Sequence, residues 1–141
     1  MIAIMMMPLE KQVCSLEPAK QLKALRVRQD SVFHWHWHRD QLPALLKDYE
    51  NTHPAWDSCS AFTVAVLGEL LPTRVFVPYK GKIPDRGYWF ECGRHLGTVE
   101  PFWCRYKLAG TDKKLEYRAD TEANVRAKML IYLMENKLVT L

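Results

Sequence analysis

The chain has 141 residues, of which 48% are hydrophobic, a length and composition that fit one globular domain with a buried core. Its 20 basic and 16 acidic residues give a net charge of +4, which excludes the charge density of a dedicated nucleic-acid arm. The four cysteines, Cys14, Cys59, Cys92 and Cys104, form no Cys-x-x-Cys pair, so the spacing of a zinc ribbon is also excluded.

The first 13 residues are expected to form a loose N-terminus. Their apolar run of seven residues, in MIAIMMMPLEK, follows no basic segment, which is unlike a secretory signal. No stretch of the chain approaches the roughly 20 apolar residues that span a bilayer. We therefore expect a soluble, cytoplasmic protein with free thiols.

Residues 14–56 are expected to form a helix-strand-helix unit. The first helix is SLEPAKQLKAL, in which Ser15 caps a run of apolar residues at helical spacing. The segment 31–38, SVFHWHWH, alternates strictly and predicts a strand. In QLPALLKDYE, preceded by Asp40 as a cap, the apolar residues fall at i, i+3, i+4 and i+7, which predicts a second helix. NTHPAWDSCS (51–60) follows as a loop.

Residues 57–141 are expected to form a helix-sheet-helix core. Ser60 is the predicted cap of AFTVAVLGELL, a helix apolar on nearly every side and therefore expected to be buried. Three or four strands are predicted next, separated by turns that carry Gly and Pro: TRVFVPY, GYWFECG, EPFWCRYKL and the shorter KLEYRA. Capped by Asp120 or Thr121, DTEANVRAKMLIYLMENK then predicts the last helix.

The predicted fold class is α+β, with an antiparallel three- to four-stranded sheet and helices packed on one face. Successive strands are expected to pair because short turns connect them. The segment 14–141 is accordingly expected to be a single domain.

Three blocks of the chain resemble a group of short uncharacterised proteins of gut bacterial genomes and prophages. The blocks are CSLEPAKQLKALRVRQDSVFHW, AFTVAVLGELLP and ADTEANVRAKMLIYLMENKLVTL. They cover more than a third of the chain, at its beginning, middle and end. Those relatives usually carry Glu where this chain has Val66, which makes the helix here more apolar. The resemblance implies a small, phage-related, intracellular protein and carries over no activity or site.

The order helix, three antiparallel strands, helix also resembles double-stranded RNA-binding domains and antitoxin domains that pair with small RNases. RNA-binding domains of this topology place lysines at the start of the final helix to meet phosphate. Here Asp120 and Glu122 occupy that end and would repel phosphate. The resemblance implies the topology and not that route of RNA binding.

The alternating histidines offer a candidate metal site. On a strand, His34, His36 and His38 point the same way, each roughly 6.6 Å from the next. Zinc holds its nitrogen ligands at about 2.0–2.1 Å, so two neighbouring imidazoles can converge on one ion but three cannot unless the strand bends. A site would need His34 with His36, or His36 with His38, and a carboxylate or His53. The favoured interpretation is a strand with its tryptophans inward and its histidines facing solvent or a neighbouring strand, with no metal and no cofactor.

The predicted sheet offers a candidate binding surface. Alternation in FWCRYKL and YWFEC puts one set of side chains under the helices, with Cys92 and Cys104 as small core residues. The other set forms an open face that displays Arg74, Trp89, Trp103, Arg105 and Lys107, joined by Phe76 and Arg118. Aromatic and basic side chains together suit single-stranded nucleic acid or a protein interface. An ordinary amphipathic sheet face is the alternative.

Signals for catalysis are poor. The chain has no Gly-x-Ser-x-Gly elbow, no phosphate-binding glycine loop and no His-Glu-x-x-His. We therefore expect a non-enzymatic protein-binding or self-associating module that acts through the open sheet face. The alternatives are a nucleic-acid-binding accessory protein using the same face, and a metal site on the histidine strand. A protein partner is favoured over nucleic acid because Glu91, Glu100 and Glu116 dilute the positive field.

Overall fold

The computed structural model describes residues 8–39, 41–47, 56–77 and 87–141. Its helices are α1 (Leu9–Gln12), α2 (Leu16–Ala24), α3 (Val64–Leu70) and α4 (Glu122–Glu135). Its strands are β1 (Phe33–His38), β2 (Gln41–Lys47), β3 (Asp57–Ser60), β4 (Arg74–Val75), β5 (Tyr88–Arg94), β6 (Phe102–Leu108) and β7 (Lys114–Ala119). The strands form two antiparallel sheets, which confirms the predicted α+β class.

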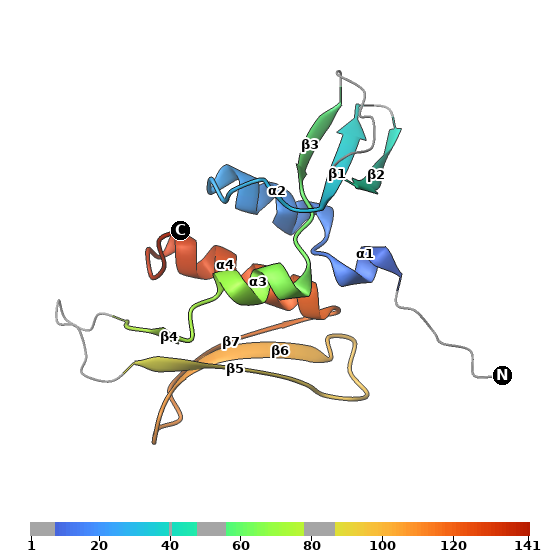
Figure 1. The fold of residues 1–141 in the computed structure, drawn as a ribbon. Helices are drawn as coiled ribbons and strands as arrows, with labels where there is room; N and C mark the ends of the chain where they lie inside the picture. Colours follow the sequence, from blue (N-terminus) through green and yellow to red (C-terminus); the bar gives the residue numbers. More distant parts are fainter. Residues whose placement is uncertain (1–7, 40, 48–55, 78–86) are drawn as a thin grey trace.

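The helices lie between the two sheets (Figure 1). The three-stranded sheet has the order β2-β1-β3 and packs through β3 against α2. The four-stranded sheet has the order β4-β5-β6-β7, so its strands pair successively as predicted, and α4 packs on β6 and β7. Figure 1 shows no helix or strand of the described chain on the other face of this sheet. That face is therefore not covered by any helix or strand of the described residues, and we call it the open sheet face.

One hydrophobic core connects the three-stranded sheet, the helices and the four-stranded sheet. It includes Leu22 of α2, Cys59 of β3, Leu67 of α3, Tyr106 of β6 and Leu130 of α4. The helix α4 is the central element, and eight of its 14 residues are buried. The strand β3 belongs to the predicted second unit, yet it pairs with β1 of the first. The two predicted units therefore share both a sheet and a core.

The prediction of a helix over residues 41–50 was wrong, because Gln41–Lys47 form the edge strand β2. Leu42 is exposed, so the apolar spacing does not mark a buried helical stripe. The register between β1 and β2 shifts between His36 and His38, and Pro43 lies opposite this irregularity. Proline has no N–H to donate and is tolerated on an edge strand or at a bulge. The proposed cap Asp40 lies outside the described residues.

The helix expected to start after Ser60 begins later, at Val64, with Thr63 as its cap. Residues Asp57–Ser60, expected as part of a loop, form β3. The chain stays extended up to the cap because the Phe62 carbonyl accepts from the Cys14 N–H at 2.9 Å. Within α3 only Leu67 is buried, so one side of the helix covers the core. The expectation of a helix buried on nearly every side was therefore wrong.

Part of the segment 1–13, expected to be loose, is ordered in the structure. Leu9–Gln12 form α1, and Val13 is buried and bridged to Thr63. Residues 1–7 lie outside the described part of the chain. None of the described helices has the length and apolar character needed to cross a membrane.

Candidate functional site

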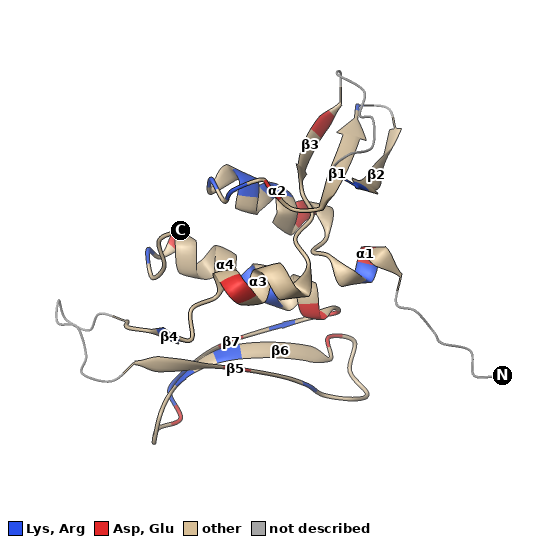
Figure 2. Cartoon of the chain, viewed as in Figure 1, with Lys and Arg blue, Asp and Glu red and all other residues tan. Residues whose placement is uncertain are grey.

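The open sheet face is defined by the residues of β4 to β7 that point away from the helices. Side chains of directly paired residues share a face of an antiparallel sheet, so the register identifies the set. Its members are Arg74, Trp89, Glu91, Gly93, Trp103, Arg105, Lys107, Lys114, Glu116 and Arg118. The five residues expected from sequence thus lie on one face. Figure 2 shows Lys and Arg positions along β6 and β7 in this sheet.

At one end of the face, Arg74 lies close to two aromatic rings. Its guanidinium carbon is 4.6 Å from the Phe76 ring centroid and 5.1 Å from that of Trp89. The rings remain accessible, since Phe76 is 38% and Trp89 45% exposed. Gly87 makes room for the arginine, because a Cβ there would overlap the Arg74 side chain. The result is a cation in contact with two exposed aromatic rings.

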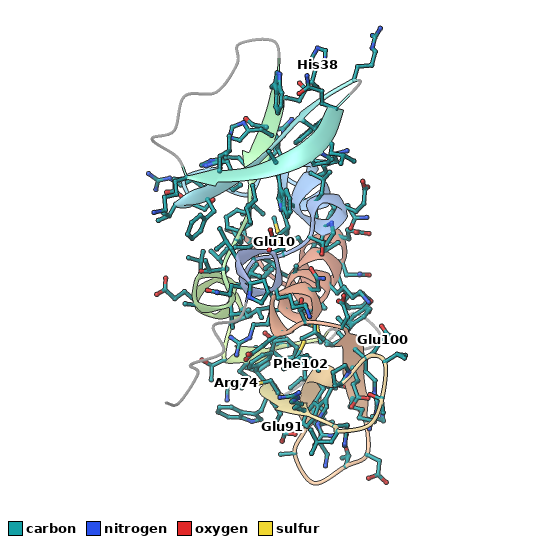
Figure 3. The ribbon with its side chains drawn as sticks, turned by 90° about the vertical axis from the view of Figure 1, so that its right-hand side faces the viewer. Glu10, His38, Arg74, Glu91, Glu100 and Phe102 are labelled. Carbon is teal, nitrogen blue, oxygen red and sulfur yellow. The ribbon has the colours of Figure 1, made fainter. Side chains whose placement is uncertain are left out.

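The middle of the face is an ion-pair network. Arg105 donates to Glu91 Oε2 from Nε at 2.7 Å and from Nη2 at 2.6 Å, and its Nη1 lies 3.8 Å from Glu116 Oε1. Lys114 and Arg118 also pair with Glu116, at 3.6 and 3.4 Å. The positive charge of Arg105 is therefore balanced within the face. Figure 3 shows Arg74 and Glu91 beside this sheet, at the opposite end of the molecule from His38.

Trp103 is only partly available on this face. It is paired with Gly93, where a Cβ would lie 2.5 Å from the indole Cζ2, so the ring packs on the glycine backbone. The Arg105 guanidinium carbon is 4.7 Å from the ring centroid. An indole covered in this way fills a gap in the sheet and cannot stack fully on a ligand. Trp89 is therefore the more accessible tryptophan of the two.

The opposite side of the sheet faces the helices, largely as expected. Cys104 and Tyr106 are fully buried, and the Tyr106 hydroxyl donates to the Pro72 carbonyl at 2.7 Å. Burial raises the pKa of the Cys104 thiol to about 12. The expectation was wrong for Cys92, which is exposed. Its Sγ lies 3.8 Å from Arg126 Nη2, at the rim of the covering helix.

The histidine strand is β1, as predicted, with both tryptophans packed against the core. Trp35 Nε1 donates to the Cys14 carbonyl at 2.9 Å. His34 and His36 are 8% and 5% exposed, so they do not face solvent as one alternative held. His34 does face a neighbouring strand, with Nε2 3.3 Å from the Ser60 hydroxyl.

The rings of His34 and His36 stand 6.2 Å apart, centroid to centroid. Within the described ranges no group of three or more His, Cys, Asp or Glu side chains comes together. His53, a possible third ligand, lies outside those ranges. The metal hypothesis therefore rests on two neighbouring imidazoles.

Two features of the molecule were missed at the level of sequence. Gly93 admits the Trp103 ring, and a lone glycine inside a strand was the available signal. Asn124 is buried in α4 and hydrogen-bonds to Ser15, 109 residues away in sequence. In the sequence, this contact is indicated only by a polar residue inside an apolar helix, which does not identify Ser15 as the residue that it contacts.

Comparison with models of protein families, with curated proteins and with solved structures finds no match for this chain. The function is therefore inferred from the geometry and charge of the open sheet face.

Proposed function

We propose that this protein is a non-enzymatic binding module that holds a protein partner on the open sheet face. The observation that carries the proposal is the exposed pair Phe76 and Trp89, with Arg74 in contact with both rings. Tryptophan and arginine dominate the binding energy of protein interfaces, since they bury large areas and offer polar contacts. Exposed aromatic rings on an uncovered sheet are the kind of surface that a partner protects from water.

The charge pattern supports a protein partner over nucleic acid. Glu91 and Glu116 lie in the middle of the face and would repel phosphate groups. Arg105 is already paired with both carboxylates, so it offers little free charge to a backbone phosphate. Single-stranded nucleic acid also requires open aromatic faces for stacking, and Trp103 is partly covered.

The same charges support a different protein over a second copy of this chain. Five basic side chains and two carboxylates share the open sheet face, so two such faces would repel each other. A partner surface with apolar groups and carboxylates would complement it. The three sequence blocks that resemble prophage proteins support a phage-related, intracellular setting for this interaction.

The free edge of β7 is poorly suited to pairing between copies. An antiparallel pairing centred on Glu116 would put Glu116 opposite its own copy and Lys114 opposite Arg118. Like charges directly opposite each other destabilise a strand pair. In addition, Lys128 Nζ donates to the Arg118 carbonyl at 2.9 Å, which occupies one acceptor of this strand. Edge charges of this kind protect a sheet from self-association.

The proposal is tested by affinity purification from the native host with the wild-type protein and two variants. Trp89→Ala removes the exposed indole, and Leu96→Ala removes an even more exposed apolar side chain from the loop between β5 and β6. We expect the wild type and Leu96→Ala to retain the same single protein partner. The amount of this partner retained by Trp89→Ala should be lower by about tenfold or more. Circular dichroism checks that all three proteins are folded.

Other results would contradict the proposal in specific ways. A partner retained equally by Trp89→Ala would place the interface elsewhere. Nuclease-sensitive retention, with binding to a single-stranded oligonucleotide that falls steeply with salt, would favour the nucleic-acid alternative. A concentration-dependent dimer in light scattering, lost in Trp89→Ala, would favour self-association. Stoichiometric zinc in the purified protein would support the alternative of a metal site at His34 and His36.

A further inference from the structure

Cys92 and Cys104 are directly opposite each other on neighbouring strands. They are register partners in the antiparallel pair of β5 and β6, so their side chains project to the same side of the sheet. That side faces the helices, away from Trp89 and the rest of the open sheet face. The two cysteines therefore lie outside the surface to which the proposed function is assigned.

The hydrogen-bond pattern brings the two cysteines close. His95 N–H donates to the Pro101 carbonyl at 2.6 Å, which marks a hydrogen-bonded pair at that step of the ladder. Such pairs alternate along an antiparallel ladder, so the pair formed by Cys92 and Cys104, three steps along, is of the non-hydrogen-bonded type. The Cα atoms of this type lie about 4.5 Å apart. Disulfides join Cα atoms about 4.4–6.8 Å apart, so little backbone movement is needed.

The two thiols differ in access. Cys92 is exposed and borders a hollow of about 200 Å³ that is also lined by Trp103 and Glu122. Cys104 is fully buried, and its Sγ donates to the Val125 carbonyl at 3.4 Å. Burial, and then the neighbouring Cys92 sulfur, raise the pKa of Cys104 to about 12. An oxidant in solution therefore meets Cys92 first, and Cys104 is positioned to react second.

We propose that Cys92 and Cys104 form a reversible cross-strand disulfide when the protein meets a small disulfide oxidant such as oxidised glutathione. In the first step the Cys92 thiolate attacks one sulfur of the oxidant, which breaks its S–S bond and releases one glutathione thiolate. In the second step the sulfur of Cys104 gives up its proton and attacks the Cys92 sulfur, which releases the second glutathione. Two protein thiols are oxidised and one glutathione disulfide is reduced to two thiols.

The two remaining cysteines serve as internal controls. Cys14 and Cys59 are buried, so neither offers a sulfur to an oxidant while the protein is folded. The product also remains reducible, since the sulfur of Cys92 stays at the surface where a thiol can attack it.

The test uses folded wild-type protein incubated with oxidised glutathione, followed by alkylation of free thiols and tryptic digestion without reduction. Trypsin separates the two cysteines into peptides 87–94 and 95–105. We expect these peptides to be joined, with loss of two of the four thiols, and dithiothreitol to restore both. A stable glutathione adduct on Cys92 without the joined peptides would overturn the proposal, as would joining of any other pair.

Two variants separate the steps. Cys104→Ala should keep a glutathione adduct on Cys92, because the attacking sulfur of the second step is gone. Cys92→Ser changes an exposed side chain and should fold normally, and we expect it to lose no thiol under the same conditions. Thiol loss in Cys92→Ser equal to that of the wild type would show that Cys92 is not the point of entry and would overturn the mechanism.

Discussion

Asn124 joins the start of α4 to the start of α2 through both ends of its amide. Its Oδ1 accepts from the Ser15 N–H at 2.7 Å, and its Nδ2 donates to Ser15 Oγ at 2.8 Å and to Asp120 Oδ1 at 3.0 Å. Ser15 was expected to cap its own helix, yet its side chain makes no cap hydrogen bond. Its hydroxyl is used to hold the two helices together.

Replacing Asn124 with alanine should lower the free energy of unfolding by about 2 kcal/mol, because the buried amide is lost and the Ser15 N–H loses its acceptor at a partly buried contact. Urea unfolding measures the change. Asn136→Ala is the matched control, since Asn136 is exposed at the end of the same helix and donates to the Tyr132 carbonyl. A change within about 0.5 kcal/mol is expected there. Equal losses in both variants would contradict the assigned role of Asn124.

At the scale of elements, the cap of α3 shows how tertiary pairing sets a helix boundary. Thr63 Oγ1 accepts from the Val66 N–H at 3.3 Å and is the N-cap. Ser60, the cap expected from sequence, is instead paired with His34 in the three-stranded sheet. Its N–H donates to Gln29 Oε1 at 2.7 Å, so it is committed to that sheet.

Thr63→Ala should therefore destabilise the protein by about 1 kcal/mol, because a helix N-terminal donor loses its acceptor. Thr63→Ser keeps a hydroxyl and should recover most of this loss. Amide hydrogen exchange at Val66 reports the cap directly and should accelerate in Thr63→Ala only. Faster exchange at Val66 in Ser60→Ala, with no effect of Thr63→Ala, would instead support the boundary expected from sequence.

Elements with a local pattern were predictable, and those that depend on distant partners were not. The helix α4 and the strands β5 to β7 follow from apolar periodicity and turn residues. The segment that forms β2 has apolar spacing compatible with a helix, and only pairing with β1 decides its structure. Likewise, alternation placed Trp103 and Arg105 on one face, but the packing on Gly93 and the pairing with Glu91 depend on register between strands.

At the scale of the whole molecule, one core holds thiols from the N-terminal region, from β3 and from β6. Burial raises the pKa of Cys14 from its ordinary value of 9.0 to about 12, that of Cys59 to about 11 and that of Cys104 to about 12. Burial also raises the pKa of Tyr106. These groups stay protonated in the folded protein at a pH where they ionise in the unfolded chain.

The free energy of unfolding should therefore fall in alkali. A group whose pKa is higher in the folded state contributes its full stability below its unfolded pKa, and this contribution is lost as the pH rises toward the folded value. For these thiols the loss begins near pH 9 and should reach about 1 kcal/mol per thiol by about pH 10. Urea unfolding across this range measures the slope.

Cys104→Ala isolates the contribution of one thiol. The free energy of unfolding of this variant should fall less steeply with pH than that of the wild type, by the amount that the Cys104 thiol contributes. Equal slopes for the wild type and Cys104→Ala would mean that the Cys104 thiol ionises as readily in the folded protein as in the unfolded chain. Its place in the core between β6 and α4 would then be wrong.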